Sequence, residues 1–322
     1  MLRRALLLGL VCGLISIGGS LAEAERTPIR KPFGIEHRTP WTTSRIQGSP
    51  DPAPPYLTEV AFPGIRFNEP LNVATEPEGD RLFVAQRDGK IFSFINDPQS
   101  MQSDLVLDVG RMTYGMTLHP NFRENGYIYV VSIVDPVKEL PEGTLLTRYQ
   151  VTGRNPPRAE KSSETIFLKW PSGGHNGGCL RFGPDGYLYI ATGDSSGIAD
   201  EFETGQDISD LVGAILRIDV DHQSDGLPYR IPADNPFVGT ANARAEIWAY
   251  GLRQAWKFSF DTKAKTLWAG EIGQDLWESI HIIRKGANYG WSIQEGRHPF
   301  RPERKQGPGP IETSIVEHPH SD

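Results

Sequence analysis

The chain has 322 residues, and its 34 Gly and 26 Pro argue against a helical bundle or a coiled coil, because Pro breaks helix interiors and Gly weakens them. Hydrophobic residues make up 38% of the sequence and aromatic residues 10%, which is enough for a substantial core and excludes wholesale disorder. The net charge of −7 comes with no basic patch, so nucleic acid is not an expected partner.

The first 24 residues have the layout of an export signal. Arg3 and Arg4 form a short positive region, residues 5–19 form an apolar core, and Ala22-Glu23-Ala24 matches a small-x-small cleavage site. We therefore expect residues 1–24 to be a signal peptide and the mature protein to be periplasmic or extracellular; a permanent N-terminal anchor is the alternative. No other run of about 20 apolar residues occurs, so no membrane span is expected after cleavage.

Residues 25–55 are rich in Pro, Arg and Thr and lack hydrophobic periodicity, which indicates a linker or an extended arm before a folded body over 56–322. Cys179 is the only cysteine of that body, since Cys12 lies in the expected signal, so no intrachain disulfide can form. We expect Cys179 to be a buried structural residue rather than a nucleophile.

One pattern repeats along the body: a polar turn with Gly or Asp, followed by a short aromatic and β-branched run. It occurs at residues 78–85, 125–131, 185–191 and 265–270. Each run is too short for a helix and is bounded by turn residues, so each predicts a strand; further strands are expected at 89–94, 145–149 and 214–219. The four runs are apolar throughout, which predicts burial on both faces. Repeated small sheets are typical of a β-propeller, with two separate β-sandwiches as the alternative.

A longer motif points to a family. Residues 175–194, HNGGCLRFGPDGYLYIATGD, resemble the glucose/sorbosone dehydrogenase family of quinoprotein sugar dehydrogenases. Further matches in the family's order lie at 118–122, 213–219, 231–237, 246–253, 258–261, 270–274 and 286–291, so the resemblance extends from about residue 57 to the end. It implies an all-β fold, a six-bladed β-propeller of the quinoprotein glucose dehydrogenase type, with pyrroloquinoline quinone (PQQ) as cofactor.

The resemblance assigns catalysis to His175 and Asp194. An imidazole titrates near neutral pH and can accept a proton from a sugar hydroxyl, and the family's His at this position is the general base. The family also has an Asp at the position of Asp194, where a carboxylate orients the imidazole. The alternatives are a loop His bonded to backbone and an Asp that caps a turn.

The resemblance assigns cofactor binding to Arg253 and Gln254. A permanently charged guanidinium suits PQQ, which carries several carboxylates. Gln254 stands where the family usually has Asn, and its amide is moved by one methylene. For Arg253 the alternative is a surface Arg in an ion pair.

Calcium is also implied by the resemblance. The main-chain carbonyls of Gly273 and Gln274 match the place where family members bind Ca²⁺ beside PQQ, where the ion polarises the quinone oxygen. A second, structural Ca²⁺ of the family uses an acidic residue and the carbonyl that corresponds to Tyr289. Here Ser279 stands at the acidic position, although Glu278 and Tyr289 remain.

Two departures from the family pattern stand out. Residues 112–115, Met-Thr-Tyr-Gly, replace Gly-Leu-Leu-Gly, and Arg111 occupies a position where the family commonly has a polar amide facing the cofactor. The sequence ends at Asp322, where family members still have about one blade to follow. We therefore expect a propeller truncated before its last blade, as a fragment of a longer chain.

Together these features predict an exported PQQ-dependent oxidoreductase that oxidises an aldose or a sorbosone-like substrate, with His175 as base and Ca²⁺ as a second cofactor. Its expected partners are a small-molecule sugar and an external electron acceptor, since no Cys-x-x-Cys-His sequence is present for covalent haem. A non-catalytic β-propeller that binds a glycan or a protein partner is the alternative, which the changes at 254, 255 and 279 favour. A hydrolytic propeller is a third hypothesis.

Overall fold

The computed structural model describes residues 56–224 and 226–320. The predicted signal peptide at 1–24 and the predicted linker at 25–55 lie outside the described residues. The fold below is that of the unit that begins at Glu59. Among its described residues, none of the helices has the length and apolar character needed to cross a membrane.

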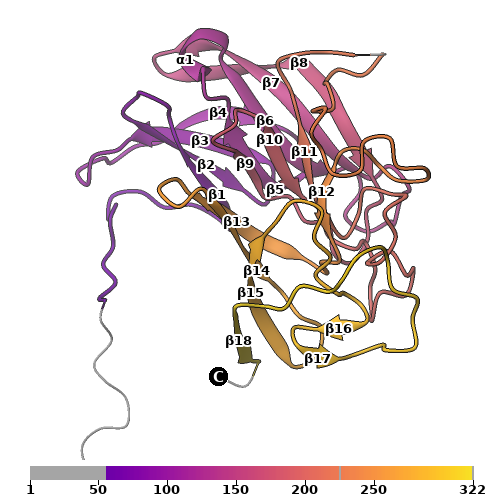
Figure 1. Ribbon diagram of the computed structural model, residues 1–322. Helices are drawn as coiled ribbons and strands as arrows, with labels where there is room; N and C mark the ends of the chain where they lie inside the picture. The colour runs from indigo at the N-terminus through magenta and orange to yellow at the C-terminus, as the bar shows by residue number, and fades with distance from the viewer. Residues whose placement is uncertain (1–55, 225, 321–322) are drawn as a thin grey trace, which may run out of the picture. The chain divides into compact units, whose positions relative to one another are not determined.

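Four antiparallel sheets of four strands each follow one another along the described residues (Figure 1). The first contains β1 (Pro70–Thr75), β2 (Arg81–Gln86), β3 (Lys90–Ile95) and β4 (Asp104–Asp108), and the second β5 (Met112–Leu118), β6 (Tyr127–Ile133), β7 (Thr144–Arg154) and β8 (Pro157–Trp170). The third contains β9 (Leu180–Phe182), β10 (Leu188–Ala191), β11 (Ala214–Ile218) and β12 (Ile247–Tyr250). The fourth contains β13 (Ala255–Asp261), β14 (Thr266–Glu271), β15 (Trp277–Ile283) and β18 (Val316–Pro319). A short helix, α1 (Phe122–Asn125), precedes β6, and β16 (Gln294–Glu295) pairs with β17 (His298–Pro299).

The first strands of consecutive sheets lie against one another: β1 contacts β5, β5 contacts β9, and β9 contacts β13. Four-stranded meanders whose inner strands meet in this way are the blades of a propeller. The prediction of an all-β, propeller-type fold is therefore confirmed, and two separate sandwiches are excluded. The four repeated runs of the sequence correspond to β2, β6, β10 and β14.

At two of the predicted turns the backbone conformation favours glycine. Gly126 (φ 68°) ends α1, where its N–H donates to the carbonyl of Phe122, and Gly186 (φ 82°) turns the chain before β10. Glycine enters this left-handed region without strain. A Cβ at Gly126 would also lie 2.3 Å from the carbonyl oxygen of Val151. The Asn-Gly and Asp-Gly pairs thus determine where β6 and β10 begin.

Apolar side chains fill the space between consecutive sheets, and β6 contributes to two such layers. Ile128 and Val130 join the cluster that the second sheet shares with the first, whereas Tyr129 and Val131 join the cluster that it shares with the third. This two-sided burial explains why β6 is apolar from Tyr127 to Val131 instead of alternating.

The cluster between the third and fourth sheets covers one face of β14. Leu267 and Ala269 are buried in it, whereas Trp268 on the opposite face is half-buried. The prediction of burial on both faces is therefore wrong for 265–270. Cys179 lies in the same cluster as a buried free thiol, and its Sγ accepts the N–H of Phe258 at 3.4 Å, as expected for a structural residue.

The last strand of the fourth sheet comes from far along the chain. β18 pairs with β15, and residues 284–315 connect the two strands. This connection carries Tyr289, Trp291 and Arg304, which take part in the site described below.

Candidate functional site

His175 and Asp194 form a hydrogen-bonded pair. His175 lies in the connection between β8 and β9, and Asp194 follows β10. His175 Nδ1 is 2.7 Å from Asp194 Oδ1, and the side chain of Asp194 is fully buried. An ionised carboxylate only accepts hydrogen bonds, so this contact favours the neutral imidazole with its proton on Nδ1 and a lone pair on Nε2. That is the tautomer in which Nε2 can act as a base.

Asp194 accepts two further hydrogen bonds. The N–H of Ser196 donates to Oδ1 at 3.0 Å, and the indole Nε1 of Trp291 donates to Oδ2 at 2.7 Å. Among the described residues no Lys or Arg pairs with this carboxylate, so these donors and His175 stabilise its buried charge. Trp291 ends the family match at 286–291, but nothing in the sequence indicates that it meets Asp194, 97 positions away.

Arg253 approaches the same network from the connection between β12 and β13. Its carbonyl accepts the N–H of Asp194 at 2.8 Å, and its guanidinium carbon lies 5.6 Å from the centroid of the Trp291 ring. The guanidinium also donates to the side-chain oxygen of Gln274, at 3.2 and 3.3 Å. The structure thus brings His175, Asp194 and Arg253 into one network, although neither of the two cavities described below is lined by both His175 and Arg253.

Gln254 holds the loop that carries His175. Its Oε1 accepts the N–H of Gly177 at 3.0 Å, and its side chain is buried. Both Arg253 and Gln254 donate their main-chain N–H to Oε1 of Glu271. Burial raises the pKa of Glu271 to about 8, so a neutral carboxylic acid supports this backbone at pH 7. With Oε1 of Gln254 taken by the main chain, its predicted contact with a cofactor would have to come from the amide nitrogen.

The loop after β14 offers free carbonyl oxygens at the predicted Ca²⁺ position. The carbonyls of Gly273 and Gln274 accept no hydrogen bond from any residue within 56–224 and 226–320, which suits the oxygen ligands of Ca²⁺. The N–H groups of Gln274 and Asp275 donate instead to the carboxylate of Glu295, both at 2.6 Å. A Cβ at Gly273 would lie 1.8 Å from the carbonyl oxygen of Trp277, so the loop requires glycine there.

No group of three His, Cys, Asp or Glu side chains in the described part of the chain is placed to hold a metal ion. A Ca²⁺ at this loop would therefore depend on main-chain oxygens, as the resemblance implies. Those oxygens are present, and the residues fit the ion in that respect.

A water-sized cavity of about 10 Å³ lies beside Tyr289, the residue predicted to serve the second Ca²⁺, and its lining includes Arg253, Glu271, Ser279 and His281. Ser279 Oγ is 3.0 Å from His281 Nε2, and burial lowers the pKa of His281 to about 4. Glu271 Oε2 and His281 Nδ1 have no hydrogen-bond partner among the described residues. The carboxyl groups of Glu271 and Glu295 also line this cavity, but its volume and its guanidinium, hydroxyl and neutral imidazole suit one water molecule.

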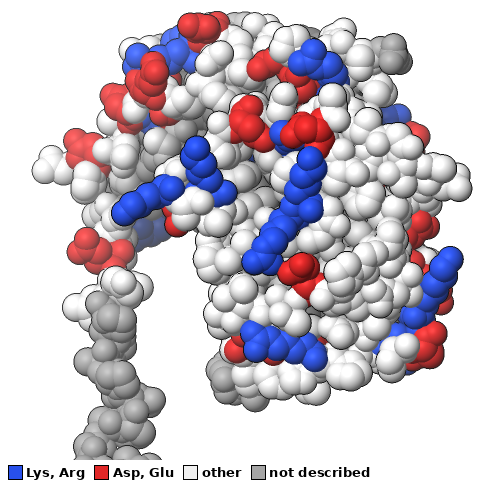
Figure 2. All heavy atoms as spheres, in the orientation of Figure 1, with Lys and Arg blue, Asp and Glu red and all other residues white. Residues whose placement is uncertain are grey.

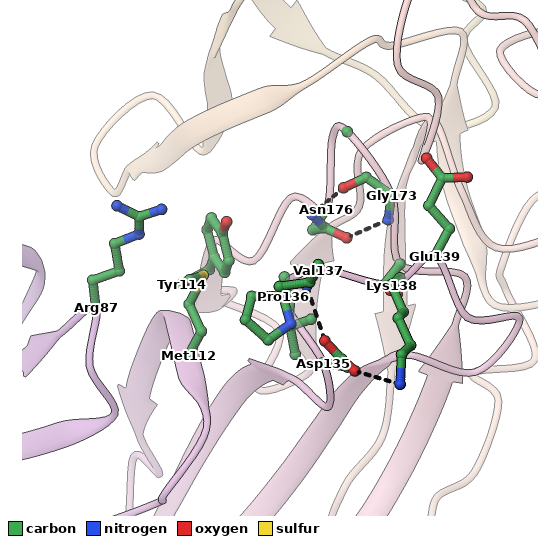
Figure 3. Close-up of a pocket in the computed structure, with 13 residues that line it drawn as sticks. Arg87, Met112, Tyr114, Asp135, Pro136, Val137, Lys138, Glu139, Gly173 and Asn176 are labelled. Carbon is green, nitrogen blue, oxygen red and sulfur yellow. Dashed lines mark hydrogen bonds and ion pairs between the residues drawn. The ribbon is translucent and has the colours of Figure 1, made fainter.

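A larger cleft of about 340 Å³ lies beside the loop that carries His175 (Figure 3). It is lined by residues 135–139 of the β6–β7 connection, by residues that flank His175 at 172–174 and 176, and by Arg87 and Tyr114. Lys138 pairs with Asp135 at 3.4 Å within this lining. Charges of both signs are also interspersed on the face of the molecule in Figure 2.

Arg111 is bound by side chains of the second sheet. Its guanidinium donates to Ser132 Oγ at 3.1 Å and to the hydroxyl of Tyr149 at 2.9 Å, and it pairs with Glu164. All three partners belong to the second sheet. The guanidinium of Arg111 therefore supports this sheet, where the family commonly has an amide.

Residues 193–197, Gly-Asp-Ser-Ser-Gly, match the Gly-x-Ser-x-Gly pattern of hydrolase nucleophiles, which the prediction from sequence overlooked. Ser195 is buried, and its hydroxyl donates to the carbonyl of Pro171 at 2.8 Å. The helix that follows such a nucleophile is also missing, since β10 leads to β11 without one. The pattern therefore gives no support to the hydrolytic hypothesis.

Comparison with known proteins gives one family match, two relatives and one solved structure. The family profile described as Glucose / Sorbosone dehydrogenase matches residues 67–316. The chain is 34% identical to HIPL2 protein of Arabidopsis thaliana over 72% of this chain and 42% of that protein, so it spans under half of that relative's length. It is 29% identical to human Hedgehog-interacting protein over 64% of this chain and 32% of that protein. Among solved structures, the PQQ-bound form of aldose sugar dehydrogenase from Streptomyces coelicolor matches with a TM-score of 0.61 at 25% identity, covering 79% of this chain and 69% of that one.

Proposed function

The chain belongs to the glucose/sorbosone dehydrogenase family, and from this premise we propose that it is an exported PQQ-dependent oxidoreductase that oxidises an aldose or a sorbosone-like sugar. One observation carries the proposal: His175 Nδ1 lies 2.7 Å from a fully buried carboxylate, Asp194, an arrangement that leaves Nε2 available as the base. The similarity to a sugar dehydrogenase solved with PQQ supports the choice of cofactor.

The chemistry of the chain's own residues follows from this pair. PQQ, when bound, supplies the acceptor for the hydride that leaves the sugar carbon. His175 Nε2 takes the proton of the sugar hydroxyl, and the Asp194 carboxylate stabilises the imidazolium that results. The guanidinium of Arg253 would bind carboxylates of the cofactor, and the carbonyls of Gly273 and Gln274 would hold Ca²⁺.

The sugar would enter from the cleft beside the His175 loop. Its volume of about 340 Å³ and its mixture of Arg87, Tyr114, Asp135, Lys138 and Glu139 suit a polyhydroxyl ligand, which needs donors, acceptors and an aromatic face. Electrons would leave to an external acceptor.

The direct test is reconstitution with PQQ and Ca²⁺ followed by dye reduction over a panel of aldoses. We expect His175→Ala to lower kcat by about 10²–10⁴-fold, because it removes the proton acceptor. His222→Ala is the matched control: this imidazole also pairs with a carboxylate, Asp219 at 2.9 Å, but its side chain is 60% exposed. Equal activity of both variants would contradict the role of His175.

A non-catalytic binding module is the second candidate, and the similarity to proteins named for interaction with Hedgehog favours it. The two functions differ in cofactor uptake. An unchanged absorption spectrum and an unchanged melting temperature after addition of PQQ and Ca²⁺ would support the binding module, with a glycan or a protein as ligand.

A further inference from the structure

Trp291 contacts both halves of the proposed site. Its indole Nε1 donates to Asp194 Oδ2 at 2.7 Å, and the guanidinium carbon of Arg253 lies 5.6 Å from its ring centroid. The side chain is 3% exposed. One residue therefore meets both the carboxylate that orients His175 and the cation predicted to hold the cofactor.

The indole N–H stabilises the charge of the Asp194 carboxylate. Asp194 Oδ1 accepts from His175 Nδ1 and from the N–H of Ser196, whereas Oδ2 accepts from Trp291 alone among the described residues. Without that donor, Oδ2 would be an unsatisfied oxygen of a fully buried anion, which is costly. The carboxylate would then draw the Nδ1 proton of His175 towards itself or rotate away from the ring.

The neighbouring contacts hold Trp291 in place. Its ring stacks on Phe300 with centroids 5.1 Å apart and an interplanar angle of 25°. Its main-chain N–H donates to the carbonyl of Gly251 at 2.9 Å, and its carbonyl accepts from Gln206 at 2.7 Å. A side chain held by a stacked ring and by its backbone can fix the position of the group it bonds.

Ser292, the residue after Trp291, is also held by hydrogen bonds. Ser292 Oγ donates to Asp200 Oδ2 at 2.6 Å and accepts from Arg304 at 2.6 Å. Arg304 also donates to the carbonyl of Ala199 at 2.9 Å. The connection between β15 and β18 is thereby tied to the loop that follows Asp194.

We propose that Trp291 is a positioning residue whose N–H holds Asp194 so that His175 keeps its proton on Nδ1 and presents Nε2 as the base. Its effect on the rate rests on the proposed function. Its effect on the His175 tautomer does not, because the tautomer is a property of the protein without substrate or cofactor.

The test compares Trp291→Phe with Trp268→Phe. The first variant keeps one aromatic ring beside Phe300 and Arg253 and deletes the N–H together with one ring of the indole, a truncation that the second variant shares. The second deletes an indole hydrogen bond of 3.1 Å, to Thr266 Oγ1 in the fourth sheet, that does not involve Asp194. The readout is the ¹⁵N NMR spectrum of protein labelled at histidine, with the His175 signals assigned by their loss in His175→Gln.

In the unchanged protein we expect His175 to be protonated at Nδ1. Trp291→Phe should shift the population towards protonation at Nε2, while Trp268→Phe leaves it as it was. In the protein reconstituted with PQQ, Trp291→Phe should lower kcat by about 10–100-fold with KM changed by less than about 3-fold, as expected for loss of a hydrogen bond to a charged group.

An unaltered His175 tautomer in Trp291→Phe overturns the proposal, whatever the activity. A shifted tautomer in a protein that shows no dehydrogenase activity keeps the positioning role and removes only the proposed function. If Trp291→Phe does not fold, site-specific replacement of Trp291 by benzothienylalanine, which has sulfur in place of the N–H, gives the same comparison with the same two outcomes.

Discussion

Asp210 is a half-buried carboxyl in the connection between β10 and β11, and its Oδ1 accepts the N–H of Val212 at 2.9 Å. Burial raises its pKa to about 7 from an ordinary value of 3.8. The folded protein therefore binds this proton more tightly than the unfolded chain does. The linked stability is fully present below about pH 4 and is lost as the pH rises to about 7.

We expect Asp210→Asn to remove this loss. The amide oxygen can still accept from Val212, so the free energy of unfolding should rise by about 1–3 kcal/mol at pH 8 and change by less than about 0.5 kcal/mol at pH 4. Urea denaturation at pH 4, 6 and 8 measures both. Asp97→Asn is the control, because Asp97 is exposed and makes the same kind of bond, to the N–H of Gln99 at 2.8 Å. A gain from Asp210→Asn that does not grow between pH 4 and 8 would contradict the assignment.

At the scale of the elements, β5 and the segment before β9 approach so closely that a side chain is excluded at Gly115. A Cβ there would lie 1.8 Å from the carbonyl oxygen of Gly178, three residues after His175. We expect Gly115→Ala to lower the free energy of unfolding by about 1–3 kcal/mol through overpacking, and to lower activity by displacing the His175 loop.

Gly270→Ala is the matched control for Gly115→Ala. Gly270 is also in a strand, β14, but the nearest atom to its added Cβ is the Lys257 carbonyl oxygen at 3.8 Å, an ordinary contact. The free energy of unfolding of Gly270→Ala should differ from that of the unchanged protein by less than about 0.5 kcal/mol. Equal losses in the two variants, measured by chemical denaturation, would show that contact with Gly178 is not the cause.

The strands could be predicted from sequence where their signals are local. The Asn-Gly and Asp-Gly turns before β6 and β10 act within a few residues, and the apolar runs after them are buried on both sides by neighbouring sheets. β18 had no such signal. It is a four-residue strand, Val316–Pro319, whose pairing with β15 is determined by tertiary contacts.

The candidate site likewise contains residues that a local motif indicates and residues that only tertiary contacts bring together. His175 and Asp194 lie in one motif of twenty residues, so the family pattern could indicate both. Trp291 and Arg304 reach the site only because the β15–β18 connection folds back over it, and nothing in their sequence neighbourhood specifies Asp194 or Asp200 as a partner. For Gln254 and Arg111 the sequence gives the position in the family pattern but not the role. Their hydrogen bonds show that Gln254 supports the His175 loop and that Arg111 supports the second sheet.

At the scale of the whole molecule, consecutive sheets share apolar clusters. The stability of each sheet therefore depends on the sheets next to it. Phe83 is fully buried between the first and second sheets, with its ring against Phe122 at 5.5 Å. Phe258 is buried between the third and fourth sheets. The two rings are matched in size and burial but lie in different layers of the core.

We expect Phe83→Ala to cost about 3–5 kcal/mol, the usual range for a buried ring replaced by methyl. We expect the destabilisation to be concentrated in the two sheets that contact Phe83. Amide hydrogen exchange should therefore show reduced protection in β1–β8, whereas the free energy of opening in β13–β15 should fall by less than about 1 kcal/mol. Phe258→Ala should give the opposite pattern, with β9–β15 affected and β1–β4 retained. Uniform loss of protection across all four sheets in either variant would mean that the described sheets unfold in one cooperative step, and that coupling between neighbours does not limit how far a local defect spreads.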